Sequence, residues 1–109
     1  MIIKKPSIFI YTYHPDTAIL KEICAGMEEE GVFYEINEQN ENNLNELAWH
    51  AANDSMLGSG IGLSGQDAAL QMKGIEKGHN IESYHEPTKE QCRKLGANSA
   101  RAIKKLAFK

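Results

Sequence analysis

The sequence has no long apolar run, and its first residues do not resemble an export signal. No stretch of its 109 residues approaches the roughly 20 apolar residues that a membrane-spanning helix needs. Residues 1–10 are too short to resemble a signal peptide and, at Lys4, Lys5 and Pro6, too polar. We therefore expect a cytoplasmic protein that makes no contact with a membrane.

Cysteine is scarce, and neither of the two cysteines has a partner at a short spacing. Cys24 and Cys92 lie within helical patterns among apolar residues, without a CxxC or CxxxC arrangement. This pattern favours two buried free thiols over a disulfide or a zinc ligand.

Catalytic and metal-binding motifs are also few. No Cys, Asp or second His stands at ligand spacing from any histidine, so we expect all four on the surface: His14, His50, His79 and His85. No Ser, His and Asp occur in a catalytic order, and Ser64 lacks the flanking glycines of a nucleophile elbow. We expect no catalysis by this chain alone.

The remaining composition is that of one ordinary globular domain, residues 1–109. Hydrophobic residues make up 41% and charged residues 25% of the chain, which argues against disorder. The 12 basic and 15 acidic residues give a net charge of 12 − 15 = −3. This total is negative, and the basic segment 93–109 contains a single aromatic residue, Phe108, so nucleic-acid binding is not expected.

The two signs of charge are separated along the chain. Eight glutamates and no Lys or Arg lie between Glu22 and Glu46, whereas six basic residues and no acid lie between Arg93 and Lys109. The split is compatible with two different contact surfaces. It is equally compatible with basic residues near a helix C-terminus that complement the helix dipole.

Strand and helix patterns alternate in the first half of the chain. This order predicts a single α/β domain of three-layer type, with a mainly parallel central sheet flanked by helices. The expected strands span residues 7–13, 32–36, 60–63, 68–72 and 81–84. The expected helices begin at Asp16 or Thr17, at Leu44 and after Thr88.

The last predicted helix has two notable features. Thr88 and Gln91 form a capping-box pattern, and the inner side of the helix is expected to carry Leu95, Ser99, Ala102 and Leu106. Gly96 stands in mid-helix, where it costs about 1 kcal/mol relative to Ala. A close approach to a sheet or a partner would explain it.

Residues 60–65 (GIGLSG) match the G-x-G-x-x-G string of dinucleotide-binding loops. That fingerprint needs a strand before it and a helix after it. Here a helix pattern precedes it, and only a weak helix pattern, residues 66–72, follows. We interpret the glycines as giving flexibility at a strand end. The alternative, a small nucleotide- or flavin-binding domain, predicts that the isolated chain binds such a ligand.

Three consecutive carboxylates, Glu28, Glu29 and Glu30, close the first predicted helix. They repel one another, and the helix C-terminus adds about half a negative charge. A cation or a basic partner would neutralise them, and a hard cation needs more oxygen ligands than one protein usually supplies. A solvated acidic face is the alternative.

Several segments, in the same order along the chain, resemble the small (β) subunit of diol and glycerol dehydratase reactivating factors. Residues 26–33 (GMEEEGVF) resemble the family's G-[IM]-E-E-E-G-[IV]-[PF]-[FY] segment, and residues 48–52 (AWHAA) its A-W-Q-A-A helix. Residues 59–62 fall where the family has a V-G-I-A strand. Residues 96–101 (GANSAR) and 106–108 (LAF) resemble its G-N-N-A-A-R helix and I-P-F ending. Residues 37–43 and the glycine-rich residues 60–65 depart from the family pattern.

This resemblance implies a function that composition does not. It implies a non-catalytic subunit of a chaperone-like, ATP-dependent factor that releases damaged cobalamin from an adenosylcobalamin-dependent diol or glycerol dehydratase. It also implies a fold similar to the dehydratase medium subunit, a large ATPase subunit as partner and the dehydratase as a transient partner. No cobalamin or nucleotide is implied for this chain itself. Whether the client is a diol or a glycerol dehydratase, and whether the chain joins a bacterial microcompartment, stay open.

The resemblance also assigns a role to one glutamate. In the family the middle glutamate of the E-E-E-G segment ligates a divalent cation at the contact with the large subunit, and that position is Glu29 here. It therefore implies Mg²⁺ or Ca²⁺ at an interface formed on this side by Glu28, Glu29 and Glu30. The alternative assignment is a medium-subunit-like component of the dehydratase itself. We expect it less because the chain is short and lacks the extensions of that subunit.

Overall fold

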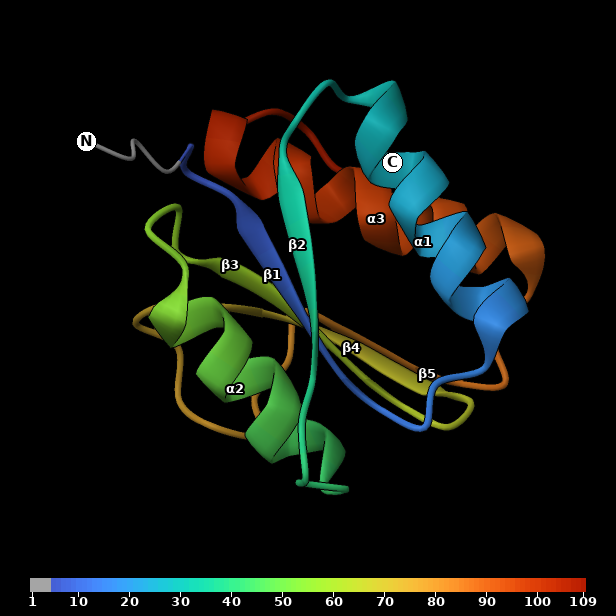
Figure 1. Cartoon of the computed structure of the whole chain (residues 1–109). Coiled ribbons are helices and arrows are strands. Elements are labelled where there is room, and N and C mark those ends of the chain that lie inside the picture. Colours follow the sequence, from blue (N-terminus) through green and yellow to red (C-terminus); the bar gives the residue numbers. More distant parts are fainter. Residues whose placement is uncertain (1–4) are drawn as a thin grey trace.

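One five-stranded sheet with helices on both faces makes up the fold in the computed structural model, which describes residues 5–109 (Figure 1). Residues 1–4 of the segment compared with a signal peptide lie outside this description. The elements in chain order are β1 (Ile8–Tyr13), α1 (Thr17–Glu29), β2 (Tyr34–Glu38), α2 (Leu44–Asp54), β3 (Ser59–Ser64), β4 (Asp67–Met72), β5 (Glu82–His85) and α3 (Lys89–Lys104). The predicted α/β class and three layers are confirmed. Within residues 5–109 no helix is long and apolar enough to cross a membrane.

The sheet is mixed, with strand order β2-β1-β3-β4-β5. β1 pairs in parallel with β2 and β3, whereas β4 pairs antiparallel with β3 and β5. Four strands thus share one direction and β4 opposes them, so the sheet is less parallel than expected. The reason is the connection between Ser64 and Asp67, where Gly65 adopts φ 58°. A turn of two residues joins only antiparallel strands, and parallel neighbours need a long crossover.

The helix ends follow local capping chemistry. Asp16 caps α1 by accepting hydrogen bonds from the Ala18 and Ile19 amides, and the expected capping box opens α3. The predicted inner position of Leu106 is wrong. Helix α3 ends at Lys104, because Lys105 turns into the left-handed region at φ 58°, and Leu106 is 48% exposed. Strand β2 begins two residues later than predicted.

Two cores lie on opposite faces of the sheet. The larger core lies under α1 and α3 and includes Ile8, Ile10, Ile23, Met27, Ile61, Leu63, Leu70 and Leu95, all fully buried. The smaller core lies under α2 and is built on Tyr11, Leu47 and Ala51. The alternation of β1 explains this division, because successive side chains of a strand point to opposite faces.

The glycine-rich segment lies under α2 and packs tightly. A Cβ on Gly60 would lie 2.2 Å from the Ala52 nitrogen, and one on Gly62 would lie 2.6 Å from the Ala48 nitrogen. The flexibility predicted for these two glycines is therefore wrong, since their missing side chains let α2 rest on β3. The segment continues into strand β4 rather than into a helix, so it lacks the helix N-terminus of a phosphate-binding loop.

Helices α1 and α3 lie side by side on the other face of the sheet (Figure 1). Each has a glycine at their contact. A Cβ on Gly96 would lie 2.0 Å from the Ile23 carbonyl oxygen, and one on Gly26 would lie 2.2 Å from that of Arg93. The close approach expected at Gly96 is confirmed, and the neighbour is helix α1 rather than a sheet or a partner. This contact brings the acidic end of α1 within reach of the basic side chains of α3.

Candidate functional site

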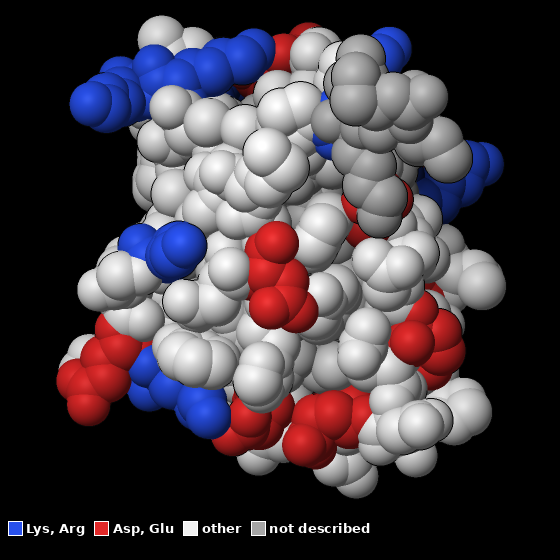
Figure 2. All heavy atoms as spheres, turned by 60° about the vertical axis from the view of Figure 1, so that its left-hand side comes forward, with Lys and Arg blue, Asp and Glu red and all other residues white. Residues whose placement is uncertain are grey.

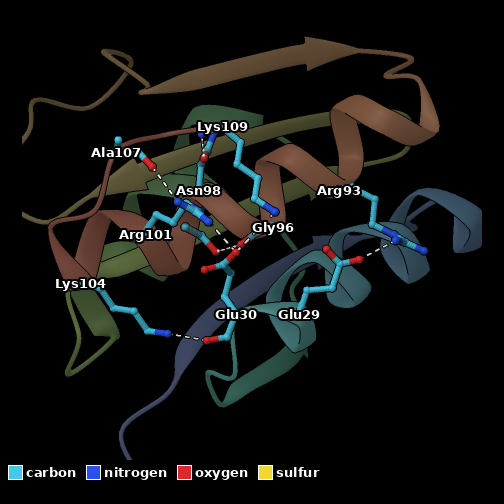
Figure 3. Close-up of polar contacts among 10 residues, drawn as sticks. Glu29, Glu30, Arg93, Gly96, Asn98, Arg101, Lys104, Ala107 and Lys109 are labelled. Carbon is cyan, nitrogen blue, oxygen red and sulfur yellow. Dashed lines mark hydrogen bonds and ion pairs between the residues drawn. The ribbon is translucent and has the colours of Figure 1, made fainter.

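The three glutamates at the end of α1 point to three different partners. Glu28 accepts a hydrogen bond of 2.6 Å from the Tyr34 hydroxyl on β2. Glu29 accepts one of 2.6 Å from Arg93 on α3. Glu30 pairs with Arg101, also on α3, at 3.3 Å (Figure 3). The sequence places these carboxylates side by side, but the fold gives each one a separate environment.

Glu29 is held in place and still accessible. Its Oε1 accepts from Arg93 Nη1, while Arg93 Nε donates to Glu22 at 2.6 Å, so one guanidinium bridges two carboxylates of α1. The Glu29 side chain remains 47% exposed. A bridging Arg fixes the carboxylate orientation, because its planar donors have a rigid geometry. Arg93 stays bound to Glu22 if Glu29 turns to another ligand.

Glu30 serves the architecture of this chain. Its side chain is only 10% exposed and lies between Arg101 and Lys109, whose Nζ is 3.6 Å away. The Glu30 carbonyl also accepts a hydrogen bond from Lys104 (Figure 3). The residues after α3 are held nearby, since Arg101 donates to the Ala107 carbonyl at 3.0 Å. Glu30 thus ties the end of α1 to the C-terminal segment.

We expect Glu30→Gln to lower the free energy of unfolding by about 1–2 kcal/mol, because the amide keeps the shape and loses the charge paired with Arg101 and Lys109. Urea unfolding followed by circular dichroism measures the change. Glu28→Gln is the matched control, since its exposed side chain bonds only a hydroxyl, and it should stay within about 0.5 kcal/mol of wild type. Equal effects of the two substitutions would contradict a structural role of Glu30.

The pairing of α1 with α3 resolves the charge asymmetry of the sequence. Two of the basic residues, Arg93 and Arg101, neutralise acidic residues of α1 within the same chain. Arg101 and Lys104 also lie in the last turn of α3, where cations complement the helix dipole. On the face shown in Figure 2, Lys and Arg gather mainly along the top and Asp and Glu mainly in the lower half. Sequence reasoning did not single out Arg93 or Arg101, although the opposite charge of the two segments pointed to their pairing.

The residues present fit a cation shared with another chain. Among residues 5–109, no three His, Cys, Asp or Glu side chains gather into a metal-binding group. Mg²⁺ and Ca²⁺ take about six or more oxygen ligands. Glu29 offers one accessible carboxylate, so most ligands of a cation there must come from water or a partner.

The predicted cysteine and histidine environments agree with the structure. Cys24 and Cys92 are both buried and free, and burial raises the pKa of each thiol. All four histidines are exposed. Asp67 raises the pKa of the exposed His85 imidazole through a hydrogen bond.

Residues 5–109 match the family model described as dehydratase medium subunit. The chain therefore belongs to the dehydratase medium subunit family. It is 28% identical over 105 residues to the propanediol dehydratase-reactivating factor small subunit of Citrobacter freundii, covering 95% of this chain and 90% of that one.

Two solved structures share the fold. A glycerol dehydratase reactivase chain superposes with a TM-score of 0.91 at 26% identity, covering 96% of this chain and 97% of that one. A chain of diol dehydratase-reactivating factor complexed with ADP and Mg²⁺ superposes with a TM-score of 0.90 at 23% identity, covering 97% and 99%. Both are matched almost from end to end, so the fold of this chain corresponds to a complete chain in each.

Proposed function

We propose that this chain is the small, non-catalytic subunit of a reactivating factor for an adenosylcobalamin-dependent diol or glycerol dehydratase. It assembles with a large ATPase subunit and helps release damaged cobalamin from the dehydratase, which it contacts transiently. Neither cobalamin nor nucleotide binds to this chain. The observation that carries the proposal is the end-to-end similarity to a curated relative and a solved chain that bear reactivating-factor names.

Glu29 is the residue of this chain that we propose to touch the divalent cation, Mg²⁺ or Ca²⁺, at the contact with the large subunit. Three features support it: the carboxylate is half exposed, it stands at the end of a helix, and Arg93 holds its orientation. The cation would neutralise negative charge at the helix C-terminus and link two chains. Glu28 and Glu30 flank Glu29 in the sequence. We place Glu28 at the rim of the contact, whereas Glu30 holds the end of α1 in place through its pairing with Arg101 and Lys109.

A reactivation assay tests the proposed function. Glycerol-inactivated dehydratase is incubated with the cognate large subunit, ATP, Mg²⁺ and fresh coenzyme, with and without this chain. Return of activity only when both subunits and ATP are present is the expected result. A large subunit that reactivates equally well alone would contradict the proposal.

A second assay distinguishes a reactivating-factor subunit from a component of the dehydratase itself. A medium-subunit-like component of the dehydratase should restore activity to a dehydratase that lacks its medium subunit, without any ATPase. We expect no such restoration. If this chain restores the incomplete enzyme and adds nothing to reactivation, the dehydratase assignment replaces the one proposed here.

A further inference from the structure

Strand β2 is an unusually open edge of the sheet. Within the described part of the chain, residues 5–109, it pairs only with β1 and forms one end of the strand order. Four of its five residues are exposed, including Ile36 at 45%, and Phe33 just before the strand is 55% exposed. Open sheet edges with apolar side chains attract further strands, and proteins usually block them with proline, lysine or a covering segment. Residues 34–38 (YEINE) contain neither proline nor lysine.

The backbone of β2 has a free row of donors and acceptors. The Phe33 carbonyl accepts from Ile8, and the Gln39 amide donates to Thr12, so the odd-numbered residues of this stretch bond to β1. Because ladder bonds alternate along a strand that pairs on one side, Tyr34, Ile36 and Glu38 direct their N–H and C=O groups away from β1. Within residues 5–109 nothing pairs with those groups.

Among residues 5–109, the carboxylates at this edge form no ion pair, in contrast to those at the α1–α3 contact. Glu22, Glu29 and Glu30 each pair with an arginine of α3. The carboxylates around β2 are different: Glu28 bonds a tyrosine hydroxyl, and Glu38 bonds Thr12 and the His14 amide. Glu35 is exposed on the strand itself. Residues 22–72 contain no Lys or Arg, so β2 and the chain on either side of it supply no basic side chain to these carboxylates.

The apolar part of the edge accepts a basic side chain. Lys5 of this chain lies with its Nζ 4.5 Å from the Phe33 ring centroid, a cation–π contact. A segment that pairs with β2 would present alternate side chains to Phe33 and Glu35 on one face and to Ile36 on the other. A basic residue and an apolar residue in alternation match these positions. A second copy of β2 does not, because it would bring Glu35 and Glu38 against like charges.

We propose that the β2 edge binds an extended, basic segment of the large subunit by strand addition. The new strand takes up the free N–H and C=O groups of Tyr34, Ile36 and Glu38. Its basic side chains pair with Glu35 and Glu38, the two glutamates of β2 itself, and its apolar side chains cover Ile36. The large subunit is named as the partner on the strength of the proposed function.

Amide hydrogen exchange resolved to single residues tests the strand addition without any substitution. In the free chain the amides of Tyr34, Ile36 and Glu38 should exchange fast, and in the complex with the large subunit they should slow by at least about tenfold. The Glu35 and Asn37 amides are the internal control, because β1 already protects them. If the Ile36 amide were protected in the free chain, and if this protection increased with the concentration of the chain, a second copy would occupy the edge. That result would overturn the proposal.

Proline substitution removes one edge donor selectively. Ile36→Pro deletes an N–H that faces outward, and edge strands tolerate proline at such positions. We expect it to weaken binding to the large subunit about tenfold, whereas Ile36→Thr, which keeps the N–H and the branched side chain, should lose less. Circular dichroism checks the fold of both variants. Equal affinities of Ile36→Pro and wild type would overturn the proposal.

Charge reversal gives a second test that leaves the backbone intact. Glu35→Lys should weaken the complex about tenfold at low salt and less at high salt, because screening reduces charge pairing between chains. Glu76→Lys is the matched control, since this exposed glutamate lies between β4 and β5. A complex that forms and reactivates with unprotected β2 amides overturns the strand addition alone. Failure to form any complex and to support reactivation overturns the proposed function as well.

Discussion

Gly96→Ala is expected to lower the free energy of unfolding by about 3 kcal/mol, although alanine is the better helix former. The new Cβ would lie 2.0 Å from the Ile23 carbonyl oxygen, a backbone atom that cannot move without the whole of α1. Helix α3 must therefore shift away from α1, and the packing of Ile23, Met27 and Leu95 loosens with it. Denaturant unfolding followed by circular dichroism measures the effect.

Gly65→Ala is the control that separates contact from backbone strain. Gly65 has φ 58°, and a Cβ added there would meet no atom of residues 5–109 within 4 Å beyond its chain neighbours. The substitution therefore introduces only left-handed backbone strain, which costs about 1–2 kcal/mol. If Gly96→Ala lowered the free energy of unfolding no more than Gly65→Ala does, α1 and α3 would separate easily, contrary to the packing described here.

Glu29→Gln is expected to weaken the complex with the large subunit by about 10- to 100-fold in the presence of Mg²⁺, while the fold stays intact. The amide keeps the size of the side chain and can still accept a hydrogen bond from Arg93, but without the negative charge it binds a hard cation more weakly than a carboxylate does. Titration calorimetry of the two purified subunits measures the affinity. Circular dichroism and unfolding measure the fold.

The chelator experiment and the neighbouring residue supply the controls. With EDTA, wild type and Glu29→Gln should bind the large subunit equally weakly, because the cation that distinguishes them is gone. Glu28→Gln should bind like wild type in Mg²⁺. If Glu29→Gln bound the large subunit in Mg²⁺ as tightly as wild type does, Glu29 would not be a ligand of a cation that links the two subunits.

The packing of α1 against α3 and the proposed cation contact are physically linked at Arg93. The Gly26 and Gly96 contact sets the distance between α1 and α3, and that distance lets Arg93 reach both Glu22 and Glu29. A wider spacing between the helices would release Glu29 from its anchor. We infer that the same two glycines that stabilise the fold also orient the carboxylate proposed to bind the cation.

Local chemistry determined the elements of this protein from the sequence alone. The Asp16 cap, the Thr88 and Gln91 capping box and the apolar periodicity placed all three helices, and the strands were located to within about two residues. The acidic segment 28–30 stood out in the sequence, and the resemblance to reactivating factors made it the candidate site. Each of these signals acts between residues close in the chain, which is why the sequence displays it.

Contacts between distant residues were decided only by the tertiary structure. The sequence indicated flexibility at Gly60 and Gly62, but the fold places α2 on them. It indicated one acidic cluster, but Glu29 pairs with Arg93 and Glu30 pairs with Arg101, so the two carboxylates have different environments. Both arginines are more than 60 residues away in the chain. Whether a glutamate is buried, anchored or free depends on which helix lies beside it. That neighbour is set by packing of the whole sheet, which no local pattern encodes.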